Sequence, residues 1–252
     1  MRENTAKARM LEGKPAYGYA LGMGSVRAAE MLAYTAIDWI LLDTQHGSFG
    51  GDQVHQCLAV MRHSPAIPMA RAARNDYTLI GRLLDEGALG IVVPMVETAE
   101  DAQCAADACL HPPRGRRSFG WGGAGEYGPD YPDWINQELF VAVQLESISA
   151  VENAEAIMSV EGIDGCWAGP ADLALSIGVD PRQAGESERH AEALEEIVRA
   201  CKAVGKIPGI AAATPEDAVR RAEQGFQFIT AGGDAGFMMS GATAGLKTLG
   251  LA

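Results

Sequence analysis

The chain has 252 residues, of which 48% are hydrophobic and 21% are charged. This length matches the typical size of a single (β/α)8 barrel, about 250 residues, and no clear linker divides the chain. The formal net charge of −13, with no basic patch in the sequence, argues against a nucleic-acid-binding protein.

Short apolar runs alternate along the chain with longer segments of helical periodicity. In chain order, we expect a strand at 17–21, a helix at 28–35, a strand at 38–42, a helix at 53–62, a strand at 67–70, a helix at 77–86, a strand at 89–93, a helix at 98–110, a strand at 139–145, a helix at 149–158, a strand at 163–167, a helix at 188–204, a strand at 207–211, a helix at 215–223 and a strand at 226–230.

This alternation indicates an α/β fold with a parallel sheet. A closed (β/α)8 TIM barrel, formed by residues 1–252 as one domain, is the economical solution for this length. A doubly wound open sheet is the alternative. It usually has a glycine fingerprint after its first strand, and here only Gly22 and Gly24 are present.

The five cysteines are scattered and have no CxxC spacing, which argues against a disulfide framework and against a zinc knuckle. No apolar run approaches the roughly 18 residues of a membrane span. The N-terminal residues have no apolar segment of the kind that a secretory signal needs. We therefore expect a cytoplasmic protein without a membrane or nucleic-acid partner.

Polar and charged side chains follow several of the predicted strands. In an α/β protein, the carboxyl ends of the strands are where ligands bind and chemistry takes place. The residues at these strand ends are Asp43, Gln45 and His46 after the second strand, Arg71 after the third, Gln144 and Glu146 at the fifth, and Gly169, Pro170, Ala171 and Asp172 after the sixth.

Glu146 and Asp172 come from neighbouring strands of the predicted barrel. Two close carboxylates repel each other unless a cation lies between them or one stays protonated. A divalent ion such as Mg²⁺ is commonly held by one or two carboxylates and several water molecules. The pair therefore predicts a metal site. The alternative is that each is a surface carboxylate, with Asp172 only capping a helix.

Arg71 offers paired donors to an oxyanion, although a simple ion pair at the barrel rim would also explain it. His46, three residues after Asp43, is expected to be a general base oriented by that carboxylate; the alternative is a buried structural histidine. We assign no function to the remaining histidines, which lie in helical or loop segments: His55, His63, His111 and His190.

The turn Gly169-Pro170-Ala171-Asp172 leads into a helix, and the free amides of a helix N-terminus bind anions. We expect a substrate carboxylate to bind to the amides of Ala171 and Asp172. A Schiff-base aldolase needs a lysine in the barrel mouth. No lysine follows a predicted strand, so a metal is expected to polarise the substrate.

Taken together, these residues resemble the HpcH/HpaI family of class II, metal-dependent pyruvate aldolases. The resemblance runs from about Gly18 to Leu246. The segments that carry it are residues 38–46 (DWILLDTQH), Arg71 with Asn75 and Asp76, residues 83–87 (LLDEG), 93–96 (VPMV), 111–115 (HPPRG), 144–146 (QLE) and 165–173 (GCWAGPADL).

The resemblance implies a TIM barrel of the phosphoenolpyruvate/pyruvate-binding type and reversible cleavage of 4-hydroxy-2-oxo acids through a metal-stabilised enolate. The products would be an aldehyde and either pyruvate or a related 2-oxo acid such as hydroxypyruvate. Glu146 and Asp172 would be the metal ligands, and Arg71 and Gln144 would contact the 2-oxo acid.

In the same way, the resemblance implies that His46, supported by Asp43, transfers protons. The amides of Ala171 and Asp172 would hold the pyruvate carboxylate. It further implies a hexamer, built as a trimer of dimers that exchange their last helix, in which Asp85 reaches the site of a neighbouring subunit.

One position departs from the family pattern, because Gln45 stands where a glutamate usually precedes the histidine. The change removes a negative charge near the metal and the base. Two alternatives to the aldolase stay open on sequence alone: an oxaloacetate-type decarboxylase that uses the same enolate, and a non-catalytic barrel that binds 2-oxo acids. The sequence also does not choose among Mg²⁺, Mn²⁺ and Co²⁺, since oxygen ligands suit all three.

Overall fold

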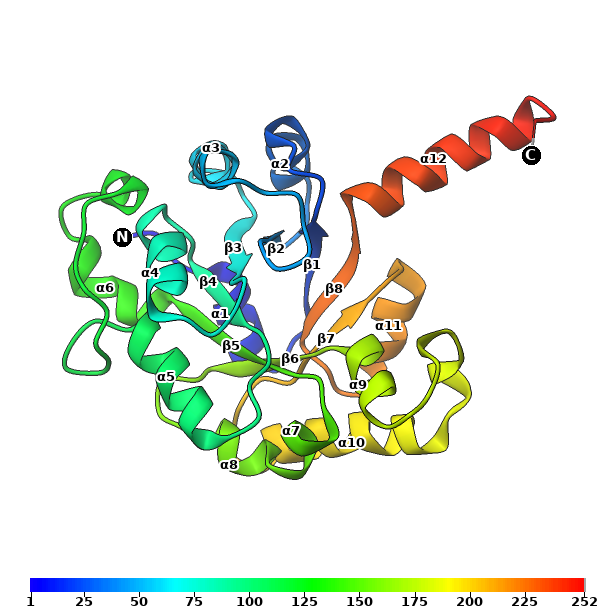
Figure 1. The fold of residues 1–252 in the computed structure, drawn as a ribbon. Helices are drawn as coiled ribbons and strands as arrows, with labels where there is room; N and C mark the ends of the chain where they lie inside the picture. The colour runs from blue at the N-terminus through cyan, green and yellow to red at the C-terminus, as the bar shows by residue number, and fades with distance from the viewer. Residues whose placement is uncertain (252) are drawn as a thin grey trace.

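The computed structural model describes residues 1–251 and contains eight parallel strands that close into a barrel in the order β1 to β8 (Figure 1). The predicted (β/α)8 barrel is therefore confirmed, and the open doubly wound sheet is excluded. The strands are β1 (Ala16–Leu21), β2 (Trp39–Asp43), β3 (Ile67–Arg71), β4 (Gly90–Val93), β5 (Phe140–Leu145), β6 (Gly165–Ala168), β7 (Gly209–Ala212) and β8 (Phe228–Gly233).

Helices cover the outside of the barrel, and one further helix lies at each end of the chain. They are α1 (Thr5–Leu11), α2 (Val26–Ala33), α3 (Gly51–Met61), α4 (Tyr77–Asp85), α5 (Ala99–Cys109), α6 (Tyr131–Glu138), α7 (Ile148–Glu152), α8 (Ala154–Met158), α9 (Pro170–Ser176), α10 (Glu188–Ala203), α11 (Pro215–Glu223) and α12 (Asp234–Thr248). Two 3-10 helices, η1 (Gly123–Tyr127) and η2 (Pro181–Glu186), lie in the long connections.

The strands are continuous apolar runs because parallel strands are buried on both faces. Every residue of β3, β4 and β5 is buried. Packing inside the barrel is close: a Cβ atom on Gly18 of β1 would lie 2.0 Å from the ring of Trp39, so the indole occupies the space that a side chain would need. This dense core sets the strand ends at fixed positions.

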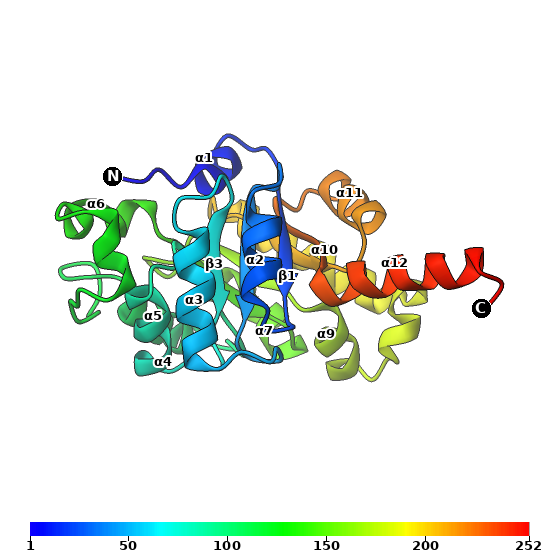
Figure 2. The ribbon, with the colours of Figure 1, turned by 90° about the horizontal axis from the view of Figure 1, so that it is seen from above.

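The N-terminal segment closes the end of the barrel where the strands begin. Figure 2 shows α1 at this end and the short helix α9 at the opposite end. Asn4 is buried and caps α1, and its side-chain amide donates to the carbonyl oxygens of Leu89 and Glu138, both at 2.9 Å. The other end of the barrel, where the strands finish, is left for the candidate site.

The ring of strands is uneven in its hydrogen bonding. β2 and β3 pair over five residue pairs, whereas β6 and β7 share one register pair, Ala168 with Ile210, and an isolated bridge between Gly165 and Ile207. The segment that follows β6 is therefore held by the strand ladder mainly on the β5 side, where β6 pairs over four residues and the Gly169 amide donates to the carbonyl oxygen of Leu145 at 3.3 Å.

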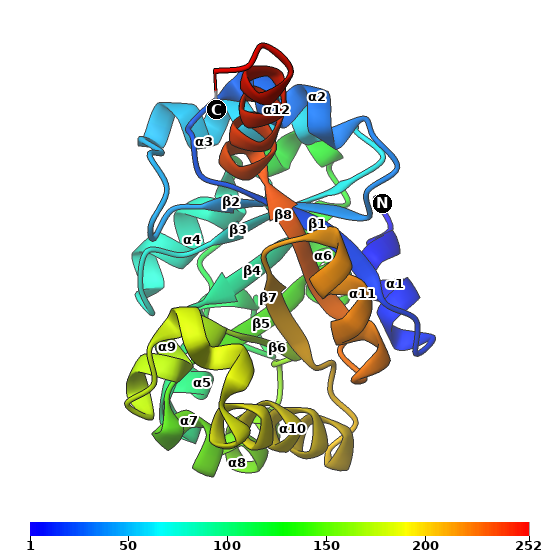
Figure 3. The same ribbon diagram turned by 90° about the vertical axis from the view of Figure 1, so that its right-hand side faces the viewer.

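The last helix, α12, projects away from the barrel (Figures 1 and 3). Only its first residue, Asp234, is buried, and the described part of the helix leaves apolar side chains such as Met238 and Met239 exposed. Within residues 1–251, no helix is both long and apolar enough to cross a membrane. The five cysteines are all free.

Candidate active site

Arg71 and Asp43 form a two-pronged ion pair at the ends of β3 and β2. The two residues are register partners on neighbouring strands. The guanidinium donates from Nη2 to Asp43 Oδ2 at 2.5 Å and from Nε to Asp43 Oδ1 at 2.9 Å. Burial alone would raise the pKa of the Asp43 carboxyl, but the hydrogen bonds and positive charge of Arg71 outweigh burial and lower it.

The Arg71 guanidinium is also held from the other side of the barrel. Its central carbon lies 5.2 Å from the ring of Trp167, which projects from β6. The Trp167 indole in turn donates to Thr230 Oγ1 of β8 at 3.1 Å. A guanidinium fixed by a carboxylate and an aromatic face keeps its remaining donors in a defined direction.

A chain of hydrogen bonds leads from Arg71 to Glu146. Arg71 Nη1 donates to Gln144 Oε1 at 3.3 Å, and the Gln144 side-chain amide donates to Glu146 Oε2. The other oxygen of Glu146 accepts from the backbone amide of Met95 at 2.9 Å. Met95 has a φ of 56°, which is unusual for a residue with a side chain and indicates strain.

Glu146 is buried, with 4% of its surface exposed. Burial raises the pKa of this carboxyl, the Met95 amide opposes the shift, and the charge of the nearby Asp172 reinforces it. Asp172 lies in the first turn of α9 and is exposed. The charge of Asp172 therefore acts on the Glu146 carboxyl.

The turn before α9 packs directly on these side chains. A Cβ atom on Gly169 would lie 2.9 Å from Glu146 Oε2 and 3.0 Å from Gln144 Nε2, so glycine permits the close approach. Ala171 and Asp172 are in the first helical turn, where backbone amides have no acceptor within the helix. These amides are available to an anion beside Glu146.

His46 lies on a short turn after β2, and its imidazole is exposed. Among residues 1–251, no group hydrogen bonds to this ring. The backbone amides of Gln45 and His46 donate to Asp43 Oδ1 at 3.0 and 3.1 Å. Asp43 thus supports Arg71 and the turn backbone, in place of the contact with the imidazole that the sequence suggested, because Arg71 is its direct partner on the next strand.

Asp85 lies far from this mouth in the same subunit. It is the last residue of α4, and a helix that follows a strand runs back toward the end where the strands begin. Its carboxylate accepts from Arg117 Nη2 at 2.9 Å. The single chain therefore does not bring Asp85 together with the other predicted residues.

Two residues of the site were not predicted from the sequence. Trp167 lies in the segment 165–173 that carries the family resemblance but was not predicted as a site residue, although a large aromatic two residues before Gly169 is a usable signal for an inward-facing strand position. Met95 contributes its backbone amide, and its residue type carries no signal for that role.

The donor set fits a divalent cation. Glu146 and Asp172 offer oxygen atoms on one side of the mouth, and hard divalent ions are commonly bound by one or two carboxylates with water or substrate completing the coordination. Within the described residues, no cluster of three or more His, Cys, Asp and Glu side chains suits a metal.

Comparison with known proteins agrees with this geometry. The family model described as "HpcH/HpaI aldolase/citrate lyase" matches residues 22–240. A 4-hydroxy-2-oxo-heptane-1,7-dioate aldolase from Klebsiella pneumoniae is 35% identical, over 96% of this chain and 92% of the relative. A hydroxypyruvate/pyruvate aldolase from Delftia acidovorans is 36% identical, over 96% of this chain and 91% of the relative.

Solved structures give the same result. An HpcH/HpaI aldolase/citrate lyase family protein from Burkholderia cenocepacia superimposes with a TM-score of 0.90 at 31% identity, over 98% of this chain and 99% of that one. An HpcH/HpaI aldolase from Desulfitobacterium hafniense gives a TM-score of 0.89 at 26% identity, over 96% of this chain and 95% of that one.

Proposed function

This chain belongs to the HpcH/HpaI aldolase/citrate lyase family and is an aldolase, a carbon–carbon lyase, and we propose that it cleaves 4-hydroxy-2-oxo acids reversibly. The products are an aldehyde and either pyruvate or a related 2-oxo acid such as hydroxypyruvate. The observation that carries the proposal is the hydrogen-bonded chain from Arg71 through Gln144 to Glu146, which faces the turn at residues 169–172.

In this proposal, Glu146 and Asp172 hold one divalent metal ion, which is Mg²⁺, Mn²⁺ or Co²⁺. Bound there, the ion supplies positive charge that polarises the 2-oxo acid and stabilises its enolate. The buried Glu146, whose pKa is raised by burial, would lose that penalty beside a cation. The exposed Asp172 leaves the opposite side open to substrate.

Arg71 stabilises the negative charge that develops on the substrate oxygen. Asp43 and Trp167 fix the plane of the guanidinium, so its donors are oriented before the substrate arrives. Gln144 binds between Arg71 and Glu146 and fixes their spacing. The amides of Ala171 and Asp172 hold the substrate carboxylate at the start of α9.

His46 accepts the proton of the 4-hydroxyl group when the carbon–carbon bond breaks. Its exposed ring lies on a short turn that is anchored to Asp43 through two backbone amides. The neighbouring Gln45 has no titratable group and does not replace the imidazole. Proton transfer therefore depends on one side chain.

We also propose that the protein assembles as a hexamer, a trimer of dimers that exchange α12. The exposed fractions of Phe237, Met238 and Met239 are 36%, 54% and 58%, and a projecting helix with such a surface is typical of a contact with another chain (Figure 3). In that assembly, Asp85 contributes to a neighbouring subunit's site.

Mixed assemblies test the shared site. Subunits with Asp85→Asn and subunits with Arg71→Lys are each expected to be impaired, and reassembly of the two together is expected to restore part of the activity. Restoration occurs only if the two residues act in the same site from different subunits. A mixture no more active than its parents would contradict the proposed role of Asp85.

The function itself is tested by following pyruvate release from a panel of 4-hydroxy-2-oxo acids, with and without a chelator. We expect metal-dependent release from at least one member of the panel. The identity of the best substrate would name the aldehyde. No release from any member, with metal present and the protein folded, would contradict the proposed substrate class.

A further inference from the structure

The way in which α9 is held in place concerns the whole candidate site, because this helix carries Asp172 and the two free amides. It follows β6, which pairs with β5 over four residues but with β7 only at Ala168, apart from the bridge at Gly165. On the β5 side, the Gly169 amide also donates to the carbonyl oxygen of Leu145 at 3.3 Å. The strand ladder therefore supports the start of the turn at residues 169–172 from one side, and a contact from another element completes its support.

His190, in the first turn of α10, provides such a contact. Its ring has 3% of its surface exposed, and Nε2 lies 2.9 Å from the carbonyl oxygen of Pro170. A carbonyl oxygen only accepts hydrogen bonds, so His190 Nε2 must carry the proton and donate. The side chain of Ser187 caps the helix and accepts a hydrogen bond from the His190 amide at 3.3 Å. This bond fixes the position of the His190 backbone, from which the ring extends.

A second contact from α10 reaches the other end of α9. Arg189 Nη1 donates at 3.3 Å to the carbonyl oxygen of Ile177, the residue that follows the last turn. Arg189 is exposed, whereas His190 is buried. Because buried hydrogen bonds are less weakened by water, the His190 contact is the stronger of the two. Two consecutive residues thus hold both ends of α9.

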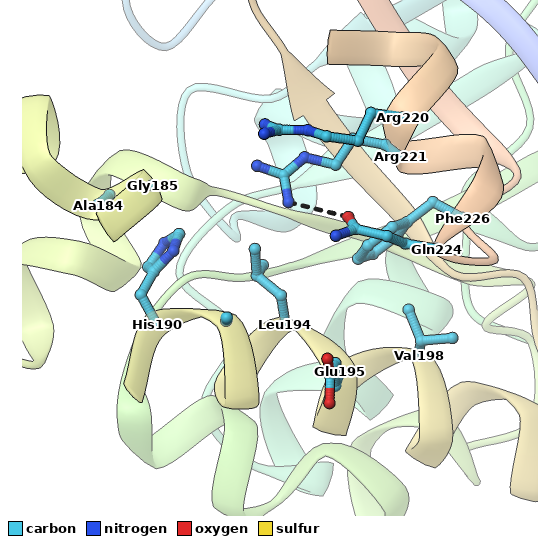
Figure 4. A pocket seen from close by; sticks show the side chains of 11 residues that line it. Ala184, Gly185, His190, Leu194, Glu195, Val198, Arg220, Arg221, Gln224 and Phe226 are labelled. Atoms are coloured by element: carbon cyan, nitrogen blue, oxygen red, sulfur yellow. Dashed lines mark hydrogen bonds between the residues drawn. The ribbon is translucent and has the colours of Figure 1, made fainter. Parts of the chain in front are cut away.

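His190 cannot itself contact the substrate. Its ring lines a cavity of about 100 Å³ between α10 and α11. Figure 4 shows the ring there with Leu194, Val198 and Phe226. None of the predicted site residues lines this cavity. The polar contact that joins His190 to the candidate site is its hydrogen bond to the Pro170 carbonyl.

We propose that His190 is a positioning residue for the substrate-carboxylate turn. By holding the Pro170 carbonyl, it keeps the amides of Ala171 and Asp172, and the Asp172 carboxylate, in the geometry that binds the 2-oxo acid and the metal. This inference rests on the proposed function, because the proposed function assigns a substrate carboxylate and a metal ion to this turn.

The experiment compares three variants. His190→Leu removes the donor and is expected to raise KM for pyruvate in the addition direction about tenfold, the effect of losing one hydrogen bond, while kcat stays within about twofold. His190→Gln keeps a side-chain N–H donor and is expected to restore most of the wild-type KM. Leu194→Ala is the matched control, because it loosens α10 beside the same cavity without touching Pro170.

Two measurements do not depend on turnover. His190→Leu should weaken Mn²⁺ binding, measured by calorimetry, and speed amide hydrogen exchange in residues 171–177. Leu194→Ala should do neither beyond its general effect on stability. If His190→Leu matches Leu194→Ala in KM, Mn²⁺ affinity and local exchange, the inference is overturned. If wild-type protein releases no pyruvate but His190→Leu alone speeds exchange in α9, the proposed function fails and the positioning role stands.

Discussion

The two ends of the barrel both contain buried or half-buried polar side chains, but these side chains have mostly different partners. At the closed end, half-buried Arg2 donates to the carbonyl oxygens of Ser64 and Ala66, both at 2.9 Å. Half-buried Lys7 donates to the carbonyl oxygen of Leu139 at 2.8 Å and also pairs with Asp164 at 3.0 Å. At the open end, the polar side chains bind mainly to one another, as Arg71 does to Asp43 and Gln144.

This difference indicates a division of roles, in which polar side chains at the closed end stabilise the fold and those at the open end form the candidate site. Side chains that donate to backbone carbonyl oxygens satisfy the hydrogen-bonding groups of the main chain, and these donors are then not available to a ligand. At the open end, burial raises the pKa of Glu146, and the neighbouring carboxylate of Asp172 adds to the shift. Carboxylates that the fold brings together at such a cost are typical of ligand sites.

Removing metal should give the largest effect and should act on the open end alone. EDTA is expected to reduce aldol cleavage to background, because Glu146 and Asp172 cannot polarise the substrate themselves. The fold, followed by circular dichroism, should not change. Borohydride with pyruvate should trap no covalent adduct, since none of the five lysines follows a strand of the barrel. A trapped lysine adduct would instead establish a Schiff-base mechanism.

His46→Ala should give the next largest effect. We expect aldol cleavage to fall by roughly 10²–10⁴-fold, the usual contribution of a positioned acid–base group. Decarboxylation of oxaloacetate, which requires no base for a hydroxyl proton, serves as the control reaction on the same preparation. If both rates fall together, His46 maintains the site in general and is not the specific base.

Arg71→Lys should reduce cleavage by roughly 10²-fold, the scale of removing one oxyanion donor. A lysine keeps the charge but not the planar pair of donors that binds Asp43 and reaches Gln144. The kcat of the purified variant at saturating metal measures the effect. A rate near that of the wild type would mean that Arg71 forms only a rim ion pair.

Asn4→Ala at the closed end should have the smallest effect on catalysis. It removes the side-chain donor from the carbonyl oxygens of Leu89 and Glu138, of which Leu89 keeps its bond from the Phe140 amide, at a cost of about 1–3 kcal/mol in unfolding free energy. Activity per folded molecule should stay within about twofold of the wild type. Lys14→Ala is the control, since Lys14 is exposed and its pair with Glu12 contributes little. If Asn4→Ala lost activity without losing stability, the proposed division of roles between the two ends of the barrel would be wrong.

The barrel could be predicted because apolar strands and amphipathic helices alternate with clear periodicity, and all eight strands overlap the predicted ranges. The last three strands begin two residues later than predicted. Local departures have local causes. The helix expected at 149–158 divides at Asn153, whose side chain donates to the carbonyl oxygen of Glu97. The segment at residues 5–11 is too short to show a helical period, so α1 was missed.

The site was predictable where chain topology alone determines it. Strand ends of a parallel barrel meet at one face, so the approach of Asp172 to Glu146 and of Arg71 to Gln144 followed from their places in the chain. Strand register decides which side chain Asp43 contacts, and the sequence does not give register. The backbone strain at Met95 likewise depends on the folded loop.

The contact between Arg71 and Trp167 has a practical consequence. An indole ring beside a cation changes its fluorescence when that cation moves, and Trp167 is buried at 4% exposure. Of the other tryptophans, Trp39 is buried in the barrel interior, and Trp121 and Trp134 lie in or just after the long loop that follows α5. Trp167 is therefore a natural fluorescent reporter at the open end of the barrel, with which the proposed binding of metal and 2-oxo acid can be titrated without a label.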